Sequence, residues 1–61
     1  MNDVRIFFID GTDSYFDKEV SNFVGLCVWL KNNNDTPFEV KIEDGPNYIL
    51  YKHAIKYVIS Y

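Results

Sequence analysis

The chain has 61 residues, which is enough for one domain but too few for two. The predicted domain spans residues 1–61. Its formal net charge is −3, and proteins that bind nucleic acids are usually basic. The charge therefore argues against a broad electrostatic contact with nucleic acid, but it leaves room for a small local basic site. A single cysteine and a single histidine exclude an intramolecular disulfide and do not supply four ligands for a structural metal ion.

A domain this small buries only about 60% of the surface of its unfolded chain, so a further source of stability is expected. Hydrophobic residues make up 48% of the chain, which favours self-association as that source. The sequence shows no secretory signal pattern and no apolar run of membrane-spanning length. Together with the unpaired cysteine, this predicts a cytoplasmic protein without a membrane partner.

The first predicted element is a strand over residues 4–10, where β-branched and aromatic residues lead into an Asp10-Gly11 turn. Residues 13–22 allow a short helix, because Asp13 or Ser14 could cap it and Phe16 and Val20 share one helical face. At about two turns such a helix is marginal. A loop or a ragged strand is the alternative for this segment.

A continuous apolar run covers residues 23–30 and contains β-branched residues, so it predicts a strand buried on both faces. Gly25 within this run indicates a bend, a bulge or a close approach of the backbone. Residues 31–37 have the composition of a loop.

Residues 38–44 alternate between apolar and charged side chains, as in a half-exposed antiparallel strand. A turn follows at residues 45–47, and residues 48–61 are strand-like except where Lys52, His53 and Ala54 interrupt the apolar pattern. The predicted fold class is therefore mostly β: a small, strongly bent sheet or barrel of five antiparallel strands.

The sequence YKHAI at residues 51–55 resembles a stretch of the bacterial Hfq proteins, which belong to the Sm-like family. Residues 38–60 follow the same family pattern: a strand that begins with Phe, a short turn, a strand that ends in YKHA, and an apolar last strand. Residues 4–11 and 23–30 look like the first and second strands of the family. The N-terminal helix of Hfq, with its polar RNA contacts, has no counterpart before Val4.

The resemblance implies an Sm-like fold, a barrel of the SH3-like kind, and a homo-oligomeric ring, expected to be a hexamer. It implies binding of single-stranded, U-rich RNA and a role in post-transcriptional regulation. In the family, the Lys-His pair lines the pore of the ring and an aromatic residue stacks on bases. The predicted RNA-binding residues are Lys52, His53, Phe38 and Tyr51. The last two strands pair between subunits, which predicts an oligomer interface at Tyr51, Ile55, Tyr57 and Ile59.

Simpler interpretations stand beside these. Lys52 and His53 could be a strand-end lysine and a hydrogen-bonded turn histidine, and Phe38 could open a core strand. Phe7 matches an aromatic that the family uses on the opposite face of the ring, but core packing is the preferred interpretation here. A protein–protein interaction module or inhibitor of the phage or plasmid type is the alternative function, because an acidic surface can mimic nucleic acid towards a basic protein partner. The sequence predicts no enzyme, no cofactor and no metal site.

Overall fold

A β-hairpin opens the computed structural model, which describes residues 2–61. Strand β1 (Asp3–Phe8) pairs with β2 (Asp13–Asp17) in antiparallel register. The turn between them needs Gly11, whose φ of 92° is in the region that glycine enters without strain. The Asp10 carboxylate accepts hydrogen bonds from the Thr12 amide at 2.9 Å and from the Thr12 hydroxyl at 2.6 Å. The predicted first strand and its Asp-Gly turn are confirmed.

These two hydrogen bonds stabilise the ionised form of Asp10 and lower its pKa from the ordinary value of 3.8, with the Thr12 hydroxyl as the larger cause. A carboxyl group whose pKa is lowered on folding adds stability above its unfolded pKa, and that stability is lost as the pH falls through the folded pKa. We expect a carbon-detected NMR titration to give Asp10 a pKa below 3.8, and Thr12→Val to move it back upwards. An Asp10 pKa unchanged by Thr12→Val would contradict this account of the turn.

Strand β5 (Ile55–Ser60) pairs with the other edge of β1, which gives a three-stranded sheet in the order β2-β1-β5. The Tyr61 amide donates to the Asp3 carbonyl at 3.0 Å, and the Phe8 amide donates to the Thr12 carbonyl at 2.8 Å. Since hydrogen-bonded pairs alternate along an antiparallel ladder, odd-numbered residues of β1 bond to β5 and even-numbered ones to β2. The backbone groups of Val58 and Ser60 therefore point towards the unpaired edge of β5.

The prediction of a strand over residues 23–30 is wrong, because this run forms helix α2 (Phe23–Lys31). Leu26 and Trp29 are buried on one side of the helix, whereas Val24 and Val28 on the other side are 75% and 57% exposed. That spacing of three and four residues is the helical period. The run is apolar all round, which hides this period from the sequence.

The segment 13–22 combines the predicted helix with its strand alternative. Its first half is β2, and its second half is the short helix α1 (Lys18–Ser21). Asp17 caps α1, because its side chain accepts from the Glu19 amide at 2.8 Å. Asn22, with φ 51° and ψ 63°, is at once the C-cap of α1 and the N-cap of α2. This left-handed residue turns the chain from one helix into the next.

A second sheet contains β3 (Phe38–Val40) and β4 (Tyr48–Leu50), which pair in antiparallel register. The predicted strand over residues 38–44 is thus shortened to its first three residues. A single 3₁₀ turn, η1 (Lys52–Ala54), leads from β4 to β5. The turn is tied to the end of β1, because the Ile9 amide donates to the Ala54 carbonyl at 2.9 Å.

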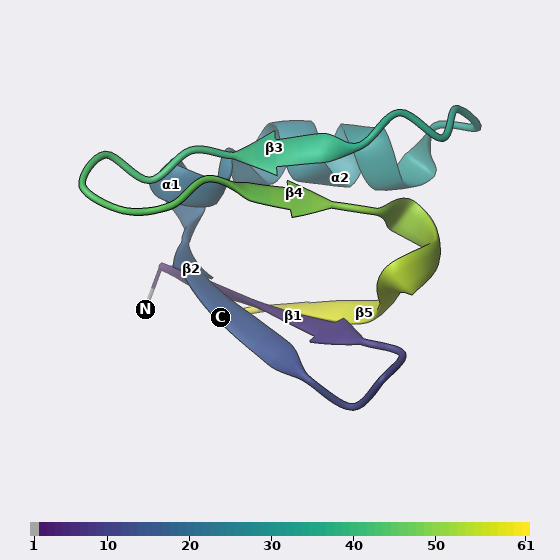
Figure 1. Ribbon diagram of the computed structural model, residues 1–61, viewed down its shortest axis with the longest axis horizontal. Helices are drawn as coiled ribbons and strands as arrows, with labels where there is room; N and C mark the ends of the chain where they lie inside the picture. The colour runs from purple at the N-terminus through teal and green to yellow at the C-terminus, as the bar shows by residue number, and fades with distance from the viewer. Residues whose placement is uncertain (1) are drawn as a thin grey trace.

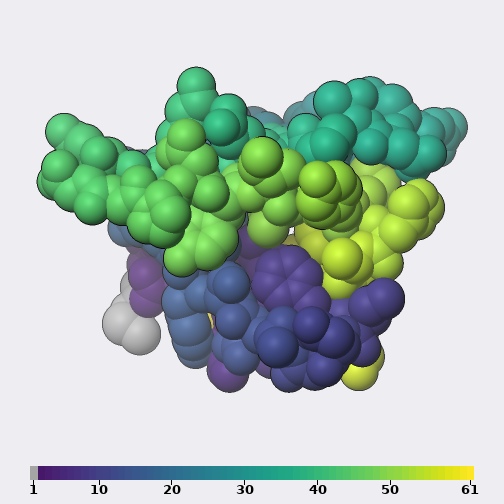
Figure 2. Space-filling view, in the orientation of Figure 1, coloured from purple at the N-terminus to yellow at the C-terminus, as the bar shows by residue number. Residues whose placement is uncertain are grey.

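The elements form two layers, with α2, β3 and β4 on one side and the sheet β2-β1-β5 on the other (Figure 1). Side chains fill the space between the layers (Figure 2). The buried apolar residues are Val4, Ile6, Phe16, Leu26, Trp29, Val40 and Leu50.

The predicted class, mostly β with antiparallel strands and a short helix, is confirmed. The five strands of residues 2–61 belong to two separate sheets, and no pairing in this part of the chain joins them. No helix of the described part is long and apolar enough to cross a bilayer.

Candidate nucleic-acid interface

Lys52 holds the loop of residues 32–37 against the turn η1. Its ammonium group donates to the carbonyl oxygens of Asn32 at 2.5 Å and of Asn34 at 2.8 Å. The same nitrogen lies 5.4 Å from the centroid of the Trp29 ring, within the range of a cation–π contact. Two of the three ammonium N–H groups thus donate within the chain, which leaves one donor for another partner.

Trp29, which is not among the predicted site residues, links Lys52 to Phe38. Its indole nitrogen donates to the Thr36 carbonyl at 2.5 Å, and its ring lies 5.3 Å from that of Phe38. Trp29 is buried and Phe38 is half-buried against the core, so one face of Phe38 is already covered. Trp29 is the only tryptophan of the chain, and this was the one sequence feature that could have marked it. Because residues 23–30 were predicted to be a strand, no contact of Trp29 with Lys52 or Phe38 was expected.

His53 and Tyr51 are the exposed members of the predicted site. The His53 imidazole lies 3.1 Å from the Asp35 carboxylate, with the His53 side chain 84% exposed. Tyr51, one residue before the turn, is 61% exposed. A pair this exposed is screened by water and adds little stability, so a ligand could replace Asp35 as the partner of His53.

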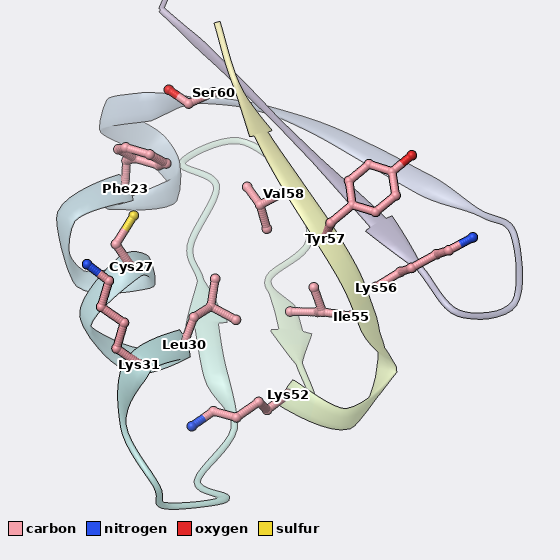
Figure 3. Close-up of a pocket in the computed structure, with 10 residues that line it drawn as sticks. All are labelled: Phe23, Cys27, Leu30, Lys31, Lys52, Ile55, Lys56, Tyr57, Val58 and Ser60. Carbon is pink, nitrogen blue, oxygen red and sulfur yellow. The ribbon is translucent and has the colours of Figure 1, made fainter.

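A groove of about 470 Å³ separates α2 from β5. Phe23, Cys27 and Leu30 line it from the helix, and Ile55 and Val58 point towards them from β5 (Figure 3). Lys31, Lys52 and Lys56 also belong to its lining. Three of the six basic residues of an acidic chain therefore border one groove, although the ammonium group of Lys56 points away from α2 (Figure 3). Lys31 and Lys52 are the lysines that give this region local positive charge.

The four predicted interface residues do not share one surface. Ile55 and Tyr57 both belong to the lining of the groove, but the ring of Tyr57 is turned away from α2 and packs against Phe7 on the outer face of the sheet (Figure 3). Ile59 lies on that outer face as well, and Tyr51 lies by the turn. The interpretation of Phe7 as a core residue is wrong. Phe7 alternates with the buried Ile6 and packs on the outer face, 4.6 Å from the ring of Tyr57.

Metal-binding chemistry gains no support from residues 2–61, in which no group of three or more His, Cys, Asp or Glu side chains comes close enough to hold an ion. The thiol of Cys27 is free and half-buried in the wall of the groove.

Comparisons of the chain with protein-family models, with curated proteins and with solved structures found no significant match. A functional assignment therefore rests on two observations: the geometry of the turn η1, and the resemblance of residues 38–60 to the Hfq sequence pattern.

Proposed function

We propose that the chain is a divergent Hfq-like member of the Sm-like family, which assembles into a ring, expected to be a hexamer, and binds single-stranded, U-rich RNA. It would act in post-transcriptional regulation in the cytoplasm and would catalyse no reaction. One observation carries the proposal. Lys52 and His53 lie on a single turn between β4 and β5, and each of these strands has an unpaired edge.

The strand pairings support the fold part of this proposal. The three antiparallel pairs are β2 with β1, β1 with β5, and β3 with β4. In an Sm-like, SH3-like barrel these strands would belong to one bent five-stranded sheet, whereas here they form two sheets, so this part of the proposal rests on the antiparallel pairs alone. Helix α2 is a departure from such a barrel, because the helix occupies the part of the chain that resembles the second strand of the family.

The unpaired edges support self-association. An exposed edge of a sheet is a template for a strand from another chain. Val58 and Ser60 direct their backbone groups to the open edge of β5, and the groove beside that edge leaves space for an added strand. A suitable strand is β4 of the next copy, whose residues Tyr48 and Ile49 are uncharged and exposed. Repeating this contact around an axis would place one η1 turn per copy side by side.

The side chains at the turn have the chemistry that single-stranded RNA requires. Tyr51 and His53 offer exposed rings on which bases can stack, and the remaining N–H of Lys52 can donate to a phosphate oxygen. Phe38 would contribute through its uncovered face, with Trp29 fixing its orientation. Repeating Lys52 around an axis would concentrate positive charge that one acidic copy lacks.

The test measures mass by light scattering and binding of a fluorescent oligouridine by anisotropy, at two salt concentrations. We expect an oligomer, and RNA binding that weakens as salt rises because lysines replace counterions at the phosphates. The double variant Lys52→Gln/His53→Ser should bind RNA at least about tenfold more weakly, equivalent to about 1.4 kcal/mol.

The matched control is Lys41→Gln, which removes the same charge at an exposed position remote from the turn. It should change RNA affinity less than twofold. A monomer that binds no oligouridine would overturn the proposal, and so would equal losses in the double variant and the control.

A further inference from the structure

The outer face of the sheet β2-β1-β5 carries a continuous aromatic surface. Side chains alternate across a strand, so the neighbours of the buried Val4, Ile6 and Phe16 point away from the core. They include Arg5, Phe7, Tyr15, Tyr57 and Tyr61, which we call the aromatic face. The remaining elements lie on the other side of this sheet (Figure 1). Nothing in residues 2–61 therefore covers the aromatic face.

Contacts within the aromatic face hold its side chains in place. The guanidinium group of Arg5 lies 4.6 Å from the ring centroid of Phe7 and 4.9 Å from that of Tyr15. Phe7 and Tyr57 are 4.6 Å apart, and Tyr15 and Tyr61 are 6.3 Å apart in a stacked arrangement. Side chains that are fixed before binding lose little conformational entropy when a partner arrives. Aromatic and arginine side chains also dominate binding energy at protein interfaces.

The polar groups of the aromatic face form a connected set. Arg5 donates from Nε to the Asp13 carboxylate at 2.8 Å, and this hydrogen bond is the main cause of a raised Arg5 pKa. A hydrogen bond between the two tyrosine hydroxyls raises the pKa of Tyr15 and lowers that of Tyr61. The contact between the hydroxyls thus joins the two tyrosines whose rings are also stacked.

Charge decides what kind of partner this surface fits. Asp3, Asp13 and Asp17 lie on the same side of the sheet as Arg5, so three carboxylates against one guanidinium leave a formal charge of −2. Asp3 and Asp17 are directly opposite each other in the register, where like charges repel. RNA and a second copy of the same face would both add negative charge, whereas a basic partner would relieve the repulsion.

We propose that the aromatic face binds an arginine-rich segment of a protein partner. Guanidinium groups of the partner would stack on Tyr15, Tyr57 and Tyr61, as Arg5 already does on its two neighbours. Asp3 and Asp17 would accept charge-assisted hydrogen bonds from the same groups. This surface is a face of the sheet, so it stays open when the edges of β4 and β5 are paired.

The test titrates the isotope-labelled full chain with a synthetic peptide of alternating arginine and glycine and follows amide shifts by NMR. We expect shifts concentrated in β1, β2 and β5, and weaker binding of the same peptide with lysine in place of arginine. Asp3→Asn/Asp17→Asn should weaken binding at least about tenfold, or about 1.4 kcal/mol. Asparagine can also cap α1, so this variant keeps the fold.

The matched control is Glu39→Gln/Glu43→Gln, which removes two charges from the part of the chain that contains β3. It should weaken peptide binding less than twofold. Tyr15→Thr/Tyr57→Thr, with residues suited to a strand, should weaken binding by a similar factor to the aspartate variant, and its amide spectrum shows whether the fold is intact. Equal losses in the control, equal affinity for the lysine peptide, or shifts that lie outside the three strands would each overturn the proposal.

Discussion

Leu26→Ala is expected to unfold most of the protein at room temperature. Leu26 is completely buried at the centre of the core, where a leucine-to-alanine change removes about 2 to 5 kcal/mol of stability. A domain of this size holds only about 3 to 5 kcal/mol from its core. Thermal unfolding followed by circular dichroism should show a fall in Tm of more than about 10 °C, or no folded baseline at all.

Val28→Ala is the matched control, and it also distinguishes the helix from the strand that the sequence predicted. In α2, Val28 lies on the exposed side, so its replacement should change stability by less than about 0.5 kcal/mol. In a strand, positions 26 and 28 would face the same way and both changes would be severe. Comparable destabilisation by the two variants would contradict the helix.

Proline at position 59 is expected to destabilise the protein far more than proline at position 60. Ile59 uses its amide in the ladder with β1, and its loss leaves a carbonyl of β1 without a donor, which costs about 1 to 3 kcal/mol. The Ser60 amide points to the open edge instead, where a strand tolerates proline. Both side chains are exposed, so the side chains themselves contribute little to the difference.

Ser60→Pro should leave a folded chain that no longer self-associates through β5, because proline offers no donor to an added strand. Urea unfolding of both variants measures the stability difference, and light scattering measures the mass of Ser60→Pro. A lower stability for Ser60→Pro than for Ile59→Pro would contradict the alternation of hydrogen bonds along β1. An unchanged oligomer mass for Ser60→Pro would instead exclude the open edge of β5 as the subunit contact.

Local signals in the sequence were enough for the strands that begin and end the chain. Residues 4–10 combine alternation with an Asp-Gly turn, and these two signals specify β1 and its hairpin without long-range information. The turn predicted at residues 45–47 lies slightly earlier in the structure, at residues 42–45, where the Gly45 amide donates to the Ile42 carbonyl at 3.3 Å. The strand β3 is shorter than its alternation suggests, because only its first three residues find a partner in β4.

Helix α2 could not be predicted in the same way. A continuous apolar run has no period to read, and valines at positions 24 and 28 favoured a strand. The capping residue of the helix, Asn22, precedes the run in an unusual left-handed conformation that sequence patterns do not reveal. The error carried over to Trp29, whose contacts with Lys52 and Phe38 exist only because the helix orients it.

The partners of Lys52 were hidden for another reason. Its hydrogen bonds end on carbonyl oxygens of the loop, and every residue type has a carbonyl, so no side-chain signal marks Asn32 or Asn34 as acceptors. His53 differs, since its partner Asp35 is a charged residue within the same loop. The sequence could suggest that the only histidine pairs with an acidic residue. The chain has nine acidic residues, so only the folded structure identifies Asp35 as the partner.

Asn22 and Gly25 should show strong epistasis. A Cβ atom at position 25 would lie 2.4 Å from the amide nitrogen of the Asn22 side chain, the same side chain that accepts from the Gly25 amide. Alanine at position 25 would therefore displace the side chain that caps α2. With glycine at position 22 there is no side chain to displace, and glycine still adopts the left-handed backbone conformation of this position. The effect of either substitution thus depends on the other, and the two sites are expected to change together in a library selected for folding.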